Sequence, residues 1–217
     1  MAKKKTAKTA ALSSDITLLL DRSGSMACVK DDMEGGMNRF VDDQKKVIGE
    51  VNFTLAQFDT EYEIVHNGIK VKDVPQLDLI PRGATALLDA VGRTIIATEE
   101  RLAKLSDKEK PNIILMIIIT DGHENSSHEF TKKQILDMIK TKQDKDKWQF
   151  TFLGANQDAI DEGSQIGVGV GQSMTYAQTK TGVANTFKNL SRSVCFCRST
   201  GQNLSYSQKD RDESMED

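Results

Sequence analysis

The feature that most constrains the fold is a set of short, continuously apolar segments that alternate with amphipathic ones. The clearest segment is "IILMIII", residues 113–119, which contains no polar residue. A strand with one face in water alternates apolar and polar residues, so this run predicts a strand buried on both faces. Such strands, when they alternate with helices, are typical of a mostly parallel sheet covered on both sides. We therefore predict an α/β fold with residues 112–120 at the centre of the sheet.

The same two periodicities predict the other elements. Apolar runs predict strands, and apolar residues spaced three and four apart predict helices. The predicted strands cover residues 15–21, 51–59, 148–154 and 173–178. The predicted helices cover residues 29–47, 88–105 and 183–197. Another helix is expected to begin at Thr131, which forms a capping-box pattern with Gln134. Asn67-Gly68 is a dipeptide that type I′ turns prefer, so we predict a hairpin turning there within residues 61–74.

The length and the ends of the chain predict one domain with two tails. A chain of 217 residues suits a single core. The first residues carry four lysines and few apolar side chains, and the last residues are polar and end with an acidic stretch. We therefore expect a flexible basic arm over residues 1–13, a folded domain over residues 14–200 and a flexible acidic tail over residues 201–217.

Charge and apolar content exclude several classes of protein. The net charge of −3 does not favour a generic nucleic-acid binder. No apolar run approaches the ~20 residues that span a bilayer, and the N-terminus has no signal-peptide core, so we expect a cytoplasmic protein that does not enter a membrane. Three cysteines are an odd and sparse set, which argues against a disulfide scaffold.

Small oxygen-bearing side chains lie at three junctions next to predicted strands or helices. Asp21, Ser23 and Ser25 alternate directly after one predicted strand, Thr85 precedes a predicted helix, and Asp121 follows the central strand. Loops at the carboxyl ends of parallel strands converge, so these side chains are expected to meet. Two carboxylates and three hydroxyls suit a hard cation such as Mg²⁺, for which Mn²⁺ could substitute. Asp59 and Asp89 also lie near element ends, and we interpret them as solvated or capping residues.

These motifs resemble a known family. "DRSGS" at residues 21–25, "RGATALLDAV" with Thr85 and "IIITDG" with Asp121 are similar to the metal-ion-dependent adhesion site (MIDAS) of von Willebrand factor A-type (vWA) domains. The resemblance covers about residues 13–200 and implies a Rossmann-like fold with one antiparallel edge strand. It implies that Ser23, Ser25 and Thr85 supply hydroxyls and that Asp21 and Asp121 bind the metal directly or through water. The chain most resembles small, stand-alone intracellular forms from bacteria and phages.

The resemblance implies a function without catalysis, and two alternatives remain open. In the main hypothesis, Mg²⁺ at these five residues binds an aspartate or glutamate of a partner protein. In the second, the protein is a metal-dependent phosphohydrolase, for which only His123 offers a base. In the third, it is a structural component of an assembly such as a phage virion and its metal site is vestigial. "HENSSHE", residues 123–129, lacks the histidine spacing of zinc proteases. The oligomeric state is not indicated.

Overall fold

The apolar runs form the middle of a six-stranded sheet in the computed structural model, which describes residues 12–155 and 159–217. The strands lie in the order β3-β2-β1-β4-β5-β6, and all neighbours are parallel except β2 and β3. Their bounds are Ser14–Asp21 (β1), Val51–Phe58 (β2), Tyr62–Lys70 (β3), Ile113–Thr120 (β4), Gln149–Gly154 (β5) and Ser173–Thr175 (β6). The predicted α/β class, with one antiparallel edge strand, is confirmed.

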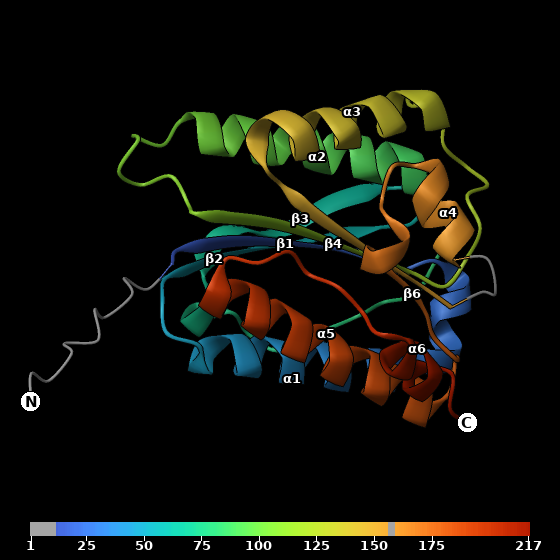
Figure 1. The fold of residues 1–217 in the computed structure, drawn as a ribbon. Coiled ribbons are helices and arrows are strands. Elements are labelled where there is room, and N and C mark those ends of the chain that lie inside the picture. Colours follow the sequence, from blue (N-terminus) through green and yellow to red (C-terminus); the bar gives the residue numbers. More distant parts are fainter. Residues whose placement is uncertain (1–11, 156–158) are drawn as a thin grey trace, which may run out of the picture.

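Helices cover both faces of this sheet (Figure 1). Helices α1 (Lys30–Lys46) and α5 (Lys180–Thr200) lie on one face, and α2 (Leu87–Ala103) and α3 (Lys132–Asp146) lie on the other. Two short helices, α4 (Ala159–Gln165) and α6 (Gln208–Ser214), and three 3₁₀ turns, η1 (Gly24–Val29), η2 (Val71–Asp73) and η3 (Val170–Gln172), complete the fold. The capping box predicted at Thr131 is present at the start of α3.

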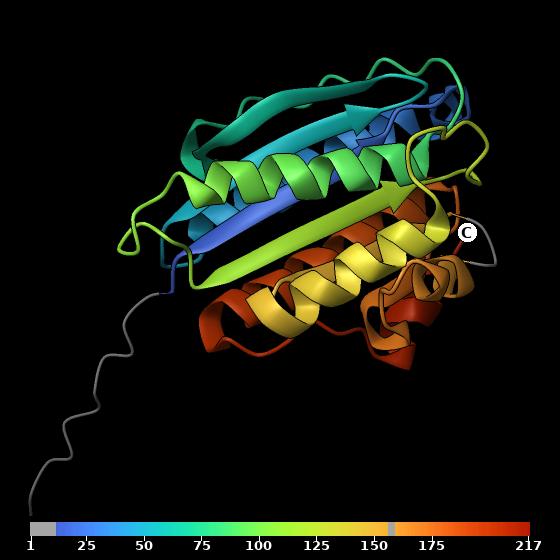
Figure 2. The same ribbon diagram turned by 90° about the horizontal axis from the view of Figure 1, so that it is seen from above.

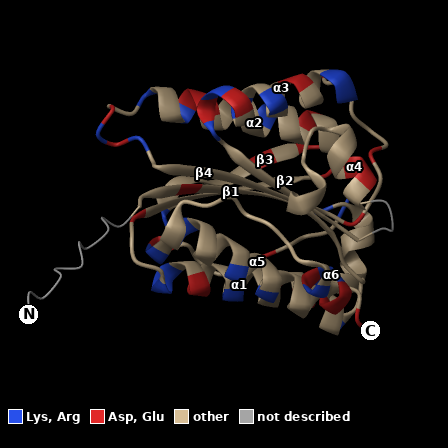
Figure 3. Cartoon of the chain, viewed as in Figure 1, with Lys and Arg blue, Asp and Glu red and all other residues tan. Residues whose placement is uncertain are grey.

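Two separate apolar cores form because successive residues of a strand point to opposite faces. In β1, Leu18 and Leu20 belong to the core beneath α1 and α5, while Leu19 belongs to the core beneath α2 and α3. All three leucines are fully buried, as is Ile117 of β4. The strands that end at the predicted metal-binding loops are therefore fixed from both sides. Charged side chains of both signs are spread over the helices, whereas the strands carry few (Figure 3).

The hairpin predicted at Asn67-Gly68 is wrong. Strand β3 runs through both residues, and the chain instead turns between β2 and β3 at residues 59–61. Gly68 does adopt a positive φ of 64°, but at a point where the β2–β3 register shifts, and its N–H donates to Thr54 Oγ1 at 2.9 Å. A left-handed glycine can serve a bulge as well as a turn, so the dipeptide alone did not distinguish the two.

The flexible tail predicted for residues 201–217 is also contradicted by the structure. Leu204 and Tyr206 are buried in the core beneath α5, and the Tyr206 hydroxyl lies 2.9 Å from Thr151 Oγ1. Helix α6 then begins with a capping box between Ser207 and Asp210. Two apolar anchors within a polar stretch were too few to reveal this segment by composition. Most of the predicted basic arm, residues 1–11, lies outside the described residues.

Among residues 12–155 and 159–217, the structure contains no helix that combines the length and apolar character needed to cross a bilayer.

Candidate metal centre

The candidate site lies where the carboxyl ends of β1 and β4 meet. These strands are adjacent and parallel, with Leu20 opposite Ile119, so the loops that follow them start side by side. Figure 2 shows the arrows of the parallel strands β2 and β4 ending at the same side of the molecule. The sequence places Asp21, Ser23 and Ser25 after β1 and Asp121 after β4, as a binding site at this edge requires.

Three of the five predicted side chains are joined by hydrogen bonds. Ser25 Oγ donates to Asp121 Oδ1 at 2.7 Å, and Ser23 Oγ lies 3.1 Å from Ser25 Oγ. Ser23 Oγ is also 3.5 Å from the same carboxylate oxygen of Asp121. Residues almost one hundred positions apart in the chain therefore bring three oxygen atoms to one point.

Asp21 lies beneath these residues and shapes the loop. Its side chain is fully buried. Its Oδ1 accepts the backbone N–H of Ser23 at 2.7 Å, and its Oδ2 accepts the hydroxyl of Thr120 at 2.6 Å. Asp21 thus fixes the turn after β1 and ties it to the end of β4.

Thr85 approaches from the loop before α2. A Cβ built on Gly122 would lie 3.1 Å from Thr85 Oγ1 and 3.8 Å from Ser25 Oγ, so both hydroxyls face the same glycine. The loop is held there because the Thr85 N–H donates to Asn125 Oδ1 at 3.0 Å and the Asn125 N–H donates to Thr85 O at 3.1 Å. All five predicted residues therefore border one region at the edge of the sheet.

The electrostatics of this region favour a cation. The pKa of Asp21 is raised to about 6, mainly because the carboxyl is buried. Hydrogen bonds from Thr120 and Ser23 lower this pKa, and the nearby Asp121 carboxylate contributes to raising it. Burial likewise raises the pKa of Asp121, although hydrogen bonds from Ser25 and other neighbours lower it. Two carboxylates that are costly to ionise side by side would be stabilised as anions by a positive ion.

The donor set fits a hard cation held largely by neutral oxygens. It contains two carboxylates and three hydroxyls, and in the described part of the chain no group of three or more His, Cys, Asp or Glu side chains is arranged to hold a metal. Oxygen donors of this kind suit Mg²⁺ or Mn²⁺. The residues present therefore fit the ion that the family resemblance implies.

Sequence reasoning missed two neighbours of Asp121. Gln178, in the loop after β6, donates from Nε2 to Asp121 Oδ2 at 2.9 Å. The buried hydroxyl of Tyr176 donates to the backbone carbonyl of Thr120 at 3.2 Å. The only available signal was their position after the last strand, at the same edge of the sheet.

Asp59 and Asp89, which were interpreted as solvated or capping residues, are both buried and hydrogen-bonded, so neither is solvated. Asp59 accepts from the guanidinium groups of Arg22 and Arg82. Asp89 accepts three consecutive backbone N–H groups of residues 128–130 and so holds the segment that leads into α3.

The residues directly after the site have structural partners of their own. Glu124 accepts the backbone N–H of Leu88 at 2.9 Å and so satisfies a free donor in the first turn of α2. His123 is exposed, and its Nδ1 contacts Glu162 of α4.

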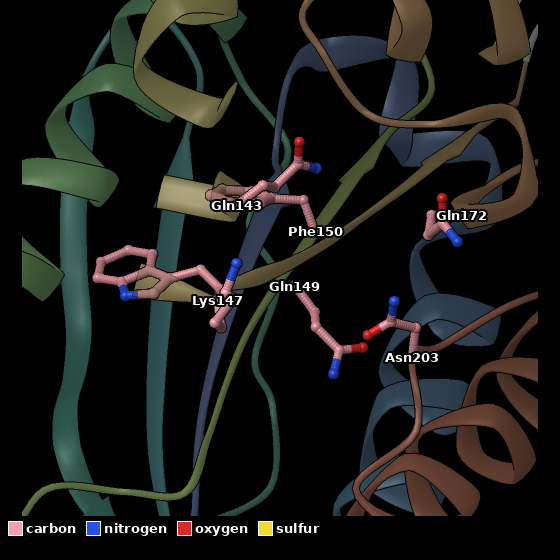
Figure 4. A pocket seen from close by; sticks show the side chains of 7 residues that line it. Gln143, Lys147, Gln149, Phe150, Gln172 and Asn203 are labelled. Atoms are coloured by element: carbon pink, nitrogen blue, oxygen red, sulfur yellow. The ribbon is translucent and has the colours of Figure 1, made fainter. Parts of the chain in front are cut away.

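A separate cavity of about 290 Å³ lies at the start of β5 (Figure 4). Gln149 and Gln172 line it together with Asn203. Gln149 Oε1 accepts the N–H of Leu204 at 2.8 Å, and Gln172 Nε2 donates to Leu204 O at 3.0 Å. These amides attach the C-terminal segment to the sheet, at the end of β5 opposite to the candidate metal centre.

Comparison by sequence finds no relative: no family model matches, and no curated protein matches. Comparison by structure finds many. The vWF domain of the type V pili tip protein Mfa5 from Porphyromonas gingivalis has a TM-score of 0.65 at 11% identity, over 89% of this chain and 99% of that one. The fold is that of a vWA domain.

Two further vWA structures extend this comparison. Proximal thread matrix protein 1 from the mussel byssus, with a zinc-occupied MIDAS motif, has a TM-score of 0.61 at 16% identity over 85% of this chain. A von Willebrand factor type A protein from Catenulispora acidiphila has a TM-score of 0.60 at 14% identity over 86%. This chain spans 46% and 43% of their lengths, respectively. The placement among stand-alone bacterial or phage forms stays a prediction.

The comparisons contradict the cytoplasmic location expected from the sequence. The matched structures include a pilus tip protein, a minor pilin and a byssal thread protein, and these are surface or extracellular proteins. The expectation rested on the lack of a signal-peptide core, which is a weak basis.

Proposed function

We propose that this vWA domain is a non-enzymatic interaction module that binds an acidic side chain of a partner protein through Mg²⁺. The ion is held by Asp21, Ser23, Ser25, Thr85 and Asp121. The observation that carries the proposal is the convergence of these side chains from three separate loops, with Ser23, Ser25 and Asp121 joined by hydrogen bonds of 2.7–3.5 Å.

Some of these side chains are buried and suited to holding a metal, and others lie where a partner protein can reach the metal. Asp21 is fully buried and beyond the reach of another protein, whereas Ser25 is exposed at the surface. Three neutral hydroxyls leave more of the positive charge of a bound ion uncompensated than carboxylates would. A bound Mg²⁺ would supply a positive charge at the surface, to which an aspartate or glutamate of the partner can bind. The zinc-occupied MIDAS motif of the mussel protein supports a divalent metal in this fold.

Thermal unfolding with and without metals tests the metal centre. The wild type, Asp121→Ala and the exposed control Asp137→Ala are compared in EDTA, Mg²⁺, Mn²⁺ and Ca²⁺. A ligand that binds only the folded state stabilises it by about 2.7 kcal/mol at a hundredfold excess over Kd. We expect Mg²⁺ or Mn²⁺ to raise the Tm of the wild type and of Asp137→Ala, but not of Asp121→Ala.

Affinity capture in Mg²⁺ and in EDTA then tests the interaction. Partners that bind the wild type in Mg²⁺ should be lost both in EDTA and with Asp121→Ala. Equal capture under all three conditions would contradict the proposal and favour a metal-independent structural role.

A further inference from the structure

Asp59 lies in the β2–β3 turn and contacts two of the loops that carry predicted metal ligands, although it is not itself one of those ligands. Its side chain is 1% exposed. Asp59 Oδ2 accepts from Arg22 Nε at 2.7 Å and from Arg82 Nε at 2.9 Å, while Oδ1 accepts the N–H of Glu61 at 2.7 Å. One carboxylate therefore closes the β2–β3 turn and holds two arginines.

The two arginines belong to the loops that carry the predicted ligands. Arg22 stands between Asp21 and Ser23, and Arg82 lies three residues before Thr85. Backbone hydrogen bonds join the same loops: the Arg82 N–H donates to Arg22 O at 2.8 Å, and the Ala86 N–H donates to Asp59 O at 3.1 Å. Asp59 thus connects the Ser23 loop to the Thr85 loop through side chain and backbone.

The charge of Asp59 matters because Asp59 forms ion pairs with both arginines. Arg22 is 6% exposed, and its other carboxylate partner, Glu63, is exposed. The other partner of Arg82, Glu61, is exposed as well. Exposed carboxylates are screened by water and salt, so the buried Asp59 supplies most of the compensation. The hydrogen bonds of Glu61, Arg82 and Arg22 outweigh the effect of burial and lower the pKa of Asp59, which keeps it ionised.

We infer that Asp59 is a positioning residue for the metal centre: through its ion pairs and hydrogen bonds it fixes the loops that carry Ser23, Ser25 and Thr85. This inference rests on the proposed function, because it presupposes that the wild type binds a metal. Residues that orient metal ligands without touching the ion commonly change metal affinity 10–100-fold.

The test measures Mn²⁺ affinity by titration calorimetry for the wild type, Asp59→Asn and Asp15→Asn. Asp15 is the matched control: it is fully buried and accepts from Arg101 at 2.7 and 2.8 Å, but it lies near the opposite end of β1. We expect Asp59→Asn to weaken Mn²⁺ binding at least about tenfold and Asp15→Asn to leave it within about twofold of the wild type. Unfolding in EDTA is measured for each variant, so that a loss of stability is recorded separately from a loss of affinity.

The possible results separate this inference from the proposed function. Wild-type affinity in Asp59→Asn, or equal weakening in both variants, overturns the inference and leaves the metal centre in place. No Mn²⁺ binding by the wild type overturns both. Should Asp59→Asn fail to fold, Arg82→Gln breaks the same link at a half-exposed side chain, and it too should bind Mn²⁺ more weakly than the wild type and Asp15→Asn do.

Discussion

At the scale of single residues, the two carboxylates of the candidate centre occupy different environments. Asp21 is buried at the end of β1, and both of its oxygens accept hydrogen bonds, from Ser23 and Thr120. Asp121 is nearer the surface, and its Oδ1 accepts the hydroxyl of the exposed Ser25. The first carboxylate therefore organises the loop, and the second is better placed to meet an ion that enters from solvent.

The raised pKa of Asp21 predicts how the stability of the metal-free protein depends on pH. The folded-state pKa of about 6 exceeds the ordinary aspartate value of 3.8, so this group contributes stability at low pH that is lost as pH rises through about 6. In EDTA, we expect the free energy of unfolding to fall by roughly 2–3 kcal/mol between pH 4 and pH 7.5, relative to an Asp21→Asn variant whose amide does not titrate.

Urea denaturation at several pH values provides this measurement. Asp121, whose pKa is also raised, adds an effect of the same sign to both proteins, so the difference between wild type and variant reports Asp21 together with its interaction with Asp121. Identical pH profiles for the two proteins would show that burial of Asp21 does not raise its pKa as inferred.

At the scale of helices and strands, the packing of α1 against α5 depends on one glycine. A Cβ on Gly36 would lie only 2.1 Å from Cδ2 of Phe187, whose ring is buried. A Cβ on the neighbouring Gly35 would meet nothing within 4 Å. Two adjacent glycines in one helix therefore have opposite constraints.

This contrast gives a matched pair of substitutions. Gly35→Ala should stabilise the protein by up to about 1 kcal/mol, because alanine has the higher helix propensity. Gly36→Ala gains the same propensity but forces the helices apart, and overpacking typically costs about 1–3 kcal/mol. We expect Gly36→Ala to be the less stable variant by roughly 1–3 kcal/mol. Thermal denaturation of both variants checks this, and equal Tm values would contradict the close contact.

The sequence predicted secondary structure correctly where a local pattern determines it, and incorrectly where a few long-range contacts determine it. The central strand and the capping box at Thr131 were predicted correctly because each depends on neighbouring residues. Gly68 forms a bulge and not a turn, and this depends on its hydrogen bond to Thr54 in another strand. The C-terminal segment packs on the domain because Leu204 is buried in a core formed by residues far away in the sequence. Such long-range contacts leave no local pattern.

The candidate site divides in the same way. Asp21, Ser23 and Ser25 form a compact motif, the start of a predicted helix pointed to Thr85, and the end of the central strand pointed to Asp121. Asp59 and Gln178 also lie near the ends of predicted strands, but their roles depend on which side chains face them in the folded protein, which the sequence does not show. The sequence could therefore suggest ligands but not the residues that hold them.

At the scale of the whole molecule, the candidate centre joins three loops at one edge of a sheet whose interior is already packed on both sides. Backbone amide hydrogens exchange with solvent when a segment of the fold opens locally, so the exchange rate reports how firmly that segment is held. A bound ligand slows this exchange wherever local opening would destroy its binding site. We expect Mg²⁺, compared with EDTA, to slow amide exchange in three loops together, namely residues 22–26, 82–86 and 121–126.

The segments at the amino-terminal ends of the parallel strands, opposite to the candidate centre, are the internal control for this measurement. Amides of residues 104–110 and 143–148, which precede β4 and β5, are far along the strands from the centre and should exchange at unchanged rates. Core amides that exchange only through global unfolding should slow as well, because the bound metal stabilises the whole fold. Asp121→Ala should abolish all of these changes. Protection confined to residues 121–126 would mean that the ion binds one loop and does not join the three, and the proposed five-residue centre would be wrong.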